Sequence, residues 1–145
     1  MKRLLACVGV SVALAAAAPT VLGASTPRYH GRIAGHAAIR FKAVVSHGEI
    51  VKVRGIHWRR LPIHCNQGRF RFRGDFDGDA FPVNDSKFRA SGTGGTTYVS
   101  HARVVGRFTK HGRRAHGTVR VRGGLDAHHT DCHSGTRRWW AHRLG

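Results

Sequence analysis

Two clusters of aromatic and basic side chains are the residues of this chain best suited to bind a ligand. The first is Trp58-Arg59-Arg60, and the second is Arg137-Arg138-Trp139-Trp140. Indole faces stack on sugars or bases, and neighbouring guanidinium groups contact an anionic backbone. In an extended strand, successive side chains point to opposite faces. We therefore expect Trp139 to pack in the core against the disulfide inferred below, and Trp140 to be exposed.

The charge of the chain points to an anionic ligand. The formal net charge is +18, and removal of Lys2 and Arg3 with a leader peptide lowers it to +16. Such an excess attracts cell-wall polymers, acidic polysaccharides, anionic lipids and nucleic acids. A GC-rich genome would also enrich arginine without any selected partner, so the charge alone names no ligand. The candidate anion-binding residues are Arg59, Arg60, Arg113, Arg114, Arg137, Arg138 and Trp140.

Acidic side chains are concentrated in one segment. Asp75, Asp77 and Asp79 occupy alternate positions in D-F-D-G-D, and carboxylates at this spacing could converge on a calcium ion. The segment departs from an EF-hand loop, because Ala80 follows Asp79 and no glutamate comes later in the chain. The competing interpretation is a turn whose carboxylates are balanced by the flanking arginines.

Residues 128–133 form a histidine-rich segment with a second set of potential metal ligands. If this segment is extended, His129, Asp131 and His133 share one face and could form a surface zinc site. Export of the protein would oxidise Cys132 and remove the best zinc ligand. The competing interpretation is a solvent-exposed loop, and we expect no bound metal or cofactor.

The same segment contains the side-chain types of a hydrolytic triad. Asp131, His133 and Ser134 lie close in the sequence, but the members of known triads come from separate positions in the chain. The sequence has no G-x-S-x-G, H-E-x-x-H or phosphate-binding loop, and Ser134 is better explained as part of a Cys-x-x-Gly turn. We therefore expect no enzymatic activity. The alternative is an exported enzyme or metal-binding protein that uses the 128–133 loop.

One sequence pattern occurs twice. V-K-V-R-G begins at Val51 and is followed, after nine residues, by C-N-Q-G; V-R-V-R-G begins at Val119 and is followed, after eight residues, by C-H-S-G. The repeat predicts two related halves whose equivalent cysteines, Cys65 and Cys132, are joined. Cys7 lies in the leader described next, and an isolated cysteine pair in an exported protein is typical of a disulfide rather than a metal site.

Residues 1–24 have the pattern of a secretory signal peptide. Met1-Lys2-Arg3 is positively charged, Leu4 to Ala18 is apolar, and Pro19 ends the apolar run. This run of 15 residues is shorter than the roughly 20 residues that a membrane-spanning helix needs. We expect residues 25–145 to form a single secreted domain without a transmembrane segment.

Alternating apolar and basic residues predict antiparallel strands through most of the chain. They lie near 37–45, 51–54, 69–73, 88, 98–108, 118–122 and 139–144, and the expected non-strand segments are 25–35, 58–62, 74–82 and 111–116. Short strands with turn signals between them are typical of sandwiches and barrels. The predicted fold is all-β: an antiparallel β-sandwich or flattened barrel of two pseudo-repeated halves linked by one disulfide.

The C-terminal motif Cys132-x-Ser134-Gly135-x3-Trp139-x-Ala141-x-Arg143 resembles the end of a group of small secreted actinobacterial proteins. Val105-Gly106-x-Phe108, Gly117-Thr118-Val119-Arg120 and Cys65-x2-Gly68 extend this resemblance over most of the mature chain. The proteins of this group are all-β and largely uncharacterised. The resemblance supports the fold and the disulfide and implies no catalytic residues.

Together these residues favour a secreted, non-catalytic module that binds anionic polymers of the cell envelope or the extracellular space. The expected partner is an anionic polysaccharide or a cell-wall polymer, and we also expect non-specific binding of polyanions. A structural or partner-binding domain with incidental charge is a further alternative.

Overall fold

The structure, a computed structural model, describes residues 25–94 and 100–145, which fold into one antiparallel sheet. No helix in these residues is long and apolar enough to cross a membrane. The leader expected in residues 1–24 and the strand start expected at Tyr98 lie outside the described residues. The nine strands are β1 (Arg28–Ile33), β2 (Ala37–Ser46), β3 (Glu49–Cys65), β4 (Gly68–Asn84), β5 (Lys87–Gly94), β6 (Ser100–Thr109), β7 (Arg114–Gly123), β8 (Cys132–His133) and β9 (Arg137–Arg143).

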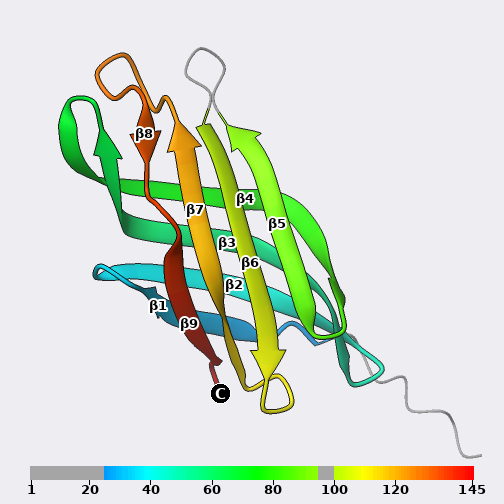
Figure 1. Ribbon diagram of the computed structural model, residues 1–145. Coiled ribbons are helices and arrows are strands. Elements are labelled where there is room, and N and C mark those ends of the chain that lie inside the picture. Colours follow the sequence, from blue (N-terminus) through cyan, green and yellow to red (C-terminus); the bar gives the residue numbers. More distant parts are fainter. Residues whose placement is uncertain (1–24, 95–99) are drawn as a thin grey trace, which may run out of the picture.

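The sheet closes on itself as a flattened ring. Strands β1 to β7 pair in sequence order, β9 pairs with β7, and β9 also pairs with β1 to complete the ring. Figure 1 shows β5, β6, β7 and β9 as one layer, with β1 to β4 crossing behind it. This confirms the predicted all-β fold.

The two sequence repeats occupy equivalent places in this ring. The first is in β3, between β2 and β4, and the second is in β7, between β6 and β9. In both copies the valines face inward or are half-buried, while the basic residues between them are exposed. Each half is therefore a run of four paired strands, β1 to β4 and then β5, β6, β7 and β9.

The disulfide joins the two halves at one end of the ring. Beyond the ends of β2 and β9, the short strand β8 lies between β3 and β7 and pairs with both. Cys132 in β8 is bonded to Cys65 at the end of β3, with the two Cα atoms 4.0 Å apart. The predicted disulfide is thus present, and it holds β8 in place between β3 of the first half and β7 of the second.

Three segments that were expected to be loops belong to strands. β1 lies in the segment 25–35, and the segments 58–62 and 74–82 are parts of β3 and β4. The predictions for 58–62 and 74–82 were wrong because bulges interrupt the alternation of side chains at two places. Arg59 and Arg60 together oppose the single residue Arg73, and Gly55 opposes the three residues 77–79. Gly55 therefore marks a bulge at a positive φ of 58° and does not end its strand. The strand in 25–35 was missed although its pairing with β2 is regular. In the segment 111–116, β7 already begins at Arg114.

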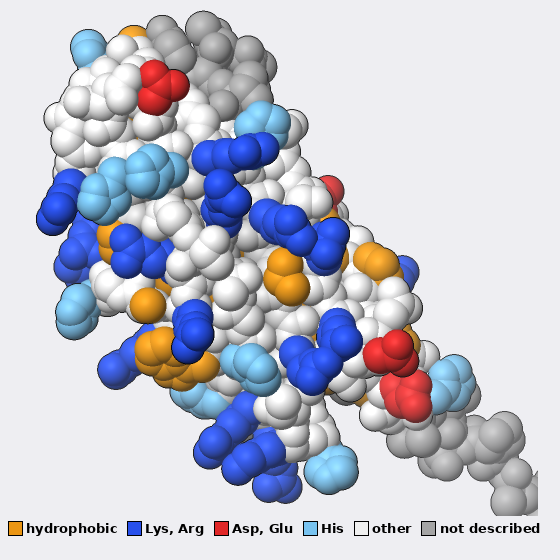
Figure 2. Space-filling model, in the orientation of Figure 1, with side chains coloured by type: hydrophobic (Ala, Val, Ile, Leu, Met, Phe, Trp, Pro, Cys, Tyr) orange, Lys and Arg blue, Asp and Glu red, His pale blue; other side chains and the backbone are white. Residues whose placement is uncertain are grey.

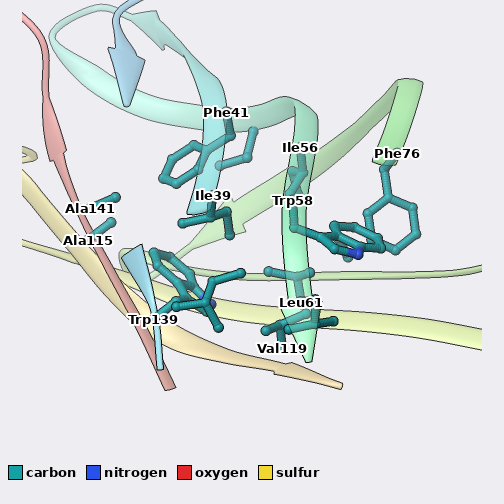
Figure 3. Close-up of a cluster of buried hydrophobic side chains, with 14 of the residues drawn as sticks. Ile39, Phe41, Ile56, Trp58, Leu61, Phe76, Ala115, Val119, Trp139 and Ala141 are labelled. Atoms are coloured by element: carbon teal, nitrogen blue, oxygen red, sulfur yellow. The ribbon is translucent and has the colours of Figure 1, made fainter. Parts of the chain in front are cut away.

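Inward-facing side chains from both layers form one hydrophobic core. Trp139 is buried, and its ring lies 5.7 Å from that of Phe41 and 6.1 Å from that of Phe88. A Cβ atom on Gly106 would lie 2.4 Å from Phe88 and 2.7 Å from Trp139, so only glycine leaves room for these rings. Figure 3 shows Trp58 beside Phe76 in a second part of the core, with the ring centroids 5.5 Å apart.

The disulfide is expected to make a large contribution to stability, because the loop it closes joins residues 67 positions apart. The chain-entropy model gives roughly 4 kcal/mol for a loop of this length. We expect the Cys65→Ala/Cys132→Ala variant to lose most of this free energy of unfolding in urea titrations. A reductant should have little effect on that variant. Equal stability of the variant and the oxidised protein would contradict this role of the disulfide.

The buried phenol of Tyr29 predicts a loss of stability in alkali. Its hydroxyl donates a hydrogen bond to the carbonyl of Gly112, and burial raises its pKa above 10.0 despite the opposing charge of Arg143. This contribution is complete below the pKa of the unfolded chain and disappears as pH rises through the folded pKa. Tyr29→Phe should therefore be less stable than the wild type by about 1 kcal/mol at neutral pH. The difference should shrink above pH 10.0 in denaturant titrations, and a constant difference would contradict the assignment.

Candidate functional site

Strand pairing places Trp140 in the middle of a row of outward-facing residues. Trp140 in β9 is 53 % exposed, and its direct cross-strand partners are His116 in β7 and Arg32 in β1. Side chains in such positions have Cβ atoms about 4.5–5.5 Å apart, so they form one continuous surface. The full row, in order across the sheet from β5 to β3, is Lys87, Arg107, His116, Trp140, Arg32, Ala38 and Arg59.

A second basic row runs beside the first. On each strand it lies two residues away from the first row, and it crosses β7, β9, β1, β2 and β3. Because alternate residues of a strand share a face, both rows lie on the same side of the sheet. Its members are Arg114, His142, His30, Arg40 and His57.

We call the outward side of six adjacent strands, β5, β6, β7, β9, β1 and β2, the basic face. None of these strands contains Asp or Glu. In Figure 2 Lys, Arg and His side chains spread over the visible part of this face, and acidic side chains appear only at its margins. Its exposed residues, apart from Trp140, include Arg28, His30, Arg32, Arg40, Lys42, Lys87, Arg89, His101, Arg103, Arg107, Arg114, His116, Arg120, Arg122, Arg138 and His142.

In the described part of the chain, the Lys and Arg side chains of the basic face are not paired with carboxylates. Within residues 25–94 and 100–145, the only ion pairs are His57 with Asp77 and His129 with Asp126, so no Lys or Arg is paired with a carboxylate. Like charges also face each other directly. Arg103 lies opposite Arg120, and Arg28 lies opposite Lys42. Like charges directly opposite each other destabilise a sheet. The face therefore carries electrostatic repulsion that an anionic ligand would relieve.

The structure separates the seven candidate anion-binding residues into three groups. Trp140, Arg114 and Arg138 lie on the basic face, and Arg59 and Arg60 border it on β3. Arg113 and Arg137 lie outside the basic face and its border. Arg113 is exposed in the turn between β6 and β7, whereas Arg137 is half-buried and its Nε donates a hydrogen bond to the carbonyl of Ser134 at 2.9 Å.

Arg137 therefore makes a structural hydrogen bond through its Nε, and its role in binding stays a prediction. Sequence reasoning missed the partners of Trp140 on the neighbouring strands, above all Arg32 and His116. The available signal was the alternation of Arg28, His30 and Arg32, which resembles that of the predicted strands.

The three aspartates proposed as calcium ligands lie in a bulge of β4. Residues 77–79 bulge out opposite Gly55, with Gly78 at φ 86°. The backbone N–H of Asp77 donates to the carboxylate of Asp75 at 3.3 Å, and Asp77 lies 3.8 Å from the imidazole of His57. No three His, Cys, Asp or Glu side chains in the described part of the chain are arranged to hold a metal ion. The carboxylates of Asp75 and Asp77 thus make local contacts.

The histidine-rich segment does not bring its three candidate zinc ligands together. His129 lies 2.7 Å from the carboxylate oxygens of Asp126, and this hydrogen bond lowers the pKa of Asp126 below its ordinary value. Asp131 instead accepts a hydrogen bond from the side chain of Asn66 at 2.8 Å. The ring of His133 stacks on that of His64, with centroids 5.7 Å apart.

Ser134 is occupied by structural hydrogen bonds. Its hydroxyl accepts from the N–H of Val121 at 2.8 Å and donates to the carbonyl of Gly135 at 2.7 Å. The side chain is also buried, with 2 % of its surface exposed. This arrangement matches the interpretation of Ser134 as part of the Cys-x-x-Gly turn. A nucleophilic serine would instead need a hydrogen bond to a basic side chain, whereas both partners of Ser134 are backbone groups.

No protein-family model, curated protein or solved structure matches the chain. The resemblance to small secreted actinobacterial proteins therefore stays a prediction. The strand order assembles the basic face around Trp140 from distant parts of the sequence.

The different exposures of the tryptophans allow a direct test of the geometry of the face. Trp58 and Trp139 are buried, at 2 % and 1 % exposure, while Trp140 is 53 % exposed. We expect acrylamide to quench mainly the fluorescence of Trp140. Trp140→Phe should remove the accessible fraction and change the free energy of unfolding by no more than about 0.5 kcal/mol, as is usual for surface substitutions. Strong quenching that persists in this variant would contradict the placement of Trp140.

Proposed function

We propose that this chain is a secreted, non-catalytic module that binds anionic polymers of the cell envelope or the extracellular space. The binding surface is the basic face, with Trp140 at its centre. The observation that carries this proposal is the combination of a carboxylate-free face with the absence of any Lys or Arg ion pair in the described residues.

The extent of the basic face favours a polymer over a small anion. Adjacent strands lie about 4.8 Å apart, so six strands span about 24 Å measured along the curved sheet. Cationic side chains occur on every one of these strands. A chain of repeating anionic groups can engage many of them at once, and each contact releases counterions from the polymer. A small anion would use only a few of these charges.

Trp140 adds a contact that charge alone does not provide. Its indole is exposed between His116 and Arg32, in a position where a sugar or another ring could stack on it. Aromatic side chains at binding surfaces combine a large apolar area with little conformational entropy to lose. The proposal therefore predicts selectivity for polymers that carry rings between their charges.

Secretion is part of the proposal and is supported by the disulfide. Disulfides persist in oxidising compartments and are rare in the cytosol, and the Cys65–Cys132 bond joins the two halves of this fold. An anionic polysaccharide or cell-wall polymer is the expected partner in such a compartment.

The test is a titration of the oxidised chain, residues 25–145, with a panel of anionic polymers at increasing salt. If six or more anionic groups are engaged, affinity should fall roughly a thousandfold between about 50 and about 200 mM salt. Trp140→Ala should weaken binding of a ring-containing polymer about fivefold or more, because stacking on one aromatic ring contributes at least about 1 kcal/mol. Isothermal titration calorimetry measures both effects.

Two controls separate specific binding from general attraction. Leu144→Ala removes the other large apolar side chain that is exposed in residues 25–94 and 100–145. Leu144 follows the last strand, and its loss should leave the affinity unchanged. A protein of the same net charge but unrelated fold reports the contribution of charge alone. Equal binding by this control protein, or an affinity that is insensitive to salt, would reject the proposed function.

A further inference from the structure

A groove borders the basic face where the turn between β1 and β2 meets β3. It has a volume of about 550 Å³. Three of the lining side chains are arginines and no lining residue is acidic. Because Arg32 is the direct cross-strand partner of Trp140, the groove is continuous with the centre of the basic face. The lining residues are Arg32, His36, Ala37, Ala38, Arg59 and Arg60.

A bulge in β3 gives the groove two of its arginines. In a regular strand, consecutive residues point to opposite faces, so only one of Arg59 and Arg60 would be exposed. Here both are exposed, while Trp58 and Leu61 on either side of them are buried. The extra residue in β3, which leaves Arg59 and Arg60 opposite Arg73 alone, produces this change. Bulges often re-aim side chains beside functional sites.

The bulge holds Arg60 in an unfavourable backbone conformation. Its φ is 60°, in the left-handed region that residues other than Gly, Asn and Asp rarely occupy. The other described non-glycine residues with positive φ lie outside the strands, in turns and in the segment before β8. A glycine or asparagine at position 60 would fit the backbone better than arginine. The observed residue therefore calls for an explanation based on its side chain.

The groove is held in shape by a residue that does not line it. The guanidinium of Arg71 in β4 donates hydrogen bonds to the carbonyl of Gly35 at 2.7 Å and to the carbonyl of Arg60 at 3.2 Å. It thus joins the turn between β1 and β2 to the bulge in β3. This link fixes the two sides of the groove relative to each other, so that Arg32 and Arg60 approach from separate elements.

We propose that this groove binds one tetrahedral oxyanion, a phosphate or sulfate group, of the polymer. The inference rests on the proposed function and assigns the anionic group that the polymer carries. A single guanidinium fork donates two hydrogen bonds to a flat carboxylate, whose two oxygens offer about four acceptor sites in one plane. Three arginines and His36 offer more donors than a carboxylate can accept, and they suit an anion whose oxygens point in several directions. With the oxyanion in the groove, the adjoining unit of the polymer lies toward Trp140.

The strain at position 60 yields a test in which stability and binding change in opposite directions. Arg60→Gly relieves the left-handed strain and should raise Tm by about 2 °C or more. The same change should weaken binding of a poly(glycerol phosphate) chain at least tenfold, because it removes one of the three guanidinium groups that line the groove. Arg60→Asn, which also tolerates this conformation, should behave in the same way. Thermal unfolding and calorimetric titration measure the two effects.

Matched variants control for strain and for charge. His47→Gly relieves a positive φ of 51° in the turn between β2 and β3, and it should raise Tm without affecting binding. Arg120→Ala removes one positive charge from an exposed position on β7 that does not line the groove, and it should weaken binding no more than about threefold. Arg60→Lys keeps the charge but loses the planar fork, so its affinity should lie below that of the wild type and above that of Arg60→Gly.

Three polymers distinguish the kind of anion. The probes are poly(glycerol phosphate), dextran sulfate and polygalacturonate, each titrated against the wild type, Arg60→Gly and Arg120→Ala. A tenfold or larger loss for Arg60→Gly on the phosphate or the sulfate polymer, with no larger loss than Arg120→Ala on the carboxylate polymer, supports the inference. The polymer that shows the greater loss identifies the oxyanion as phosphate or sulfate.

The inference is overturned if Arg60→Gly matches Arg120→Ala on all three polymers, or if it weakens all three equally. In either case, continued dependence of binding on Trp140 leaves the proposed function standing. If no polymer binds the wild type better than the charge-matched control protein, the proposed function itself fails. The two failures are thus separated by measurements on the same set of proteins.

Discussion

Pairing of β9 with β1 is the interaction on which both the ring and the basic face depend. It brings a C-terminal strand against the first strand of the domain and places Trp140 opposite Arg32. The approach is so close that a Cβ atom on Gly31 would lie 2.0 Å from the carbonyl oxygen of Trp140. Any larger residue at position 31 would push the strands apart. The ring would then open at the centre of the surface that we propose binds the ligand.

The local pattern of the sequence was enough to predict the class of fold, because alternation depends only on neighbouring residues. It failed where bulges shift the alternation by one or more positions. Trp58 and Leu61 are both buried although three positions apart, which has no counterpart in a regular strand. The disulfide was predictable for a different reason, since the repeat around Cys65 and Cys132 is visible in the sequence itself.

The candidate site was predictable only in part. Exposure of Trp140 follows from alternation along one strand, and the structure confirms it. The residues beside it come from β7 and β1, and no local pattern states which strands are neighbours in a sheet. The groove depends in addition on the bulge at Arg59 and Arg60 and on the reach of Arg71 from β4. A single sequence contains no sign of these contacts.

The distribution of charge has a physical consequence for the stability of the domain. Repulsion between pairs such as Arg103 and Arg120 acts in the folded sheet and is weaker in the expanded unfolded chain, so it lowers the free energy of unfolding. The buried core and the disulfide at Cys65 have to offset this cost. The polyanion that we propose as ligand would relieve the repulsion mainly in the folded form, since only the folded chain holds these side chains on one face. Binding energy and stability are therefore linked through the same side chains, and the domain should be most stable when its ligand is present.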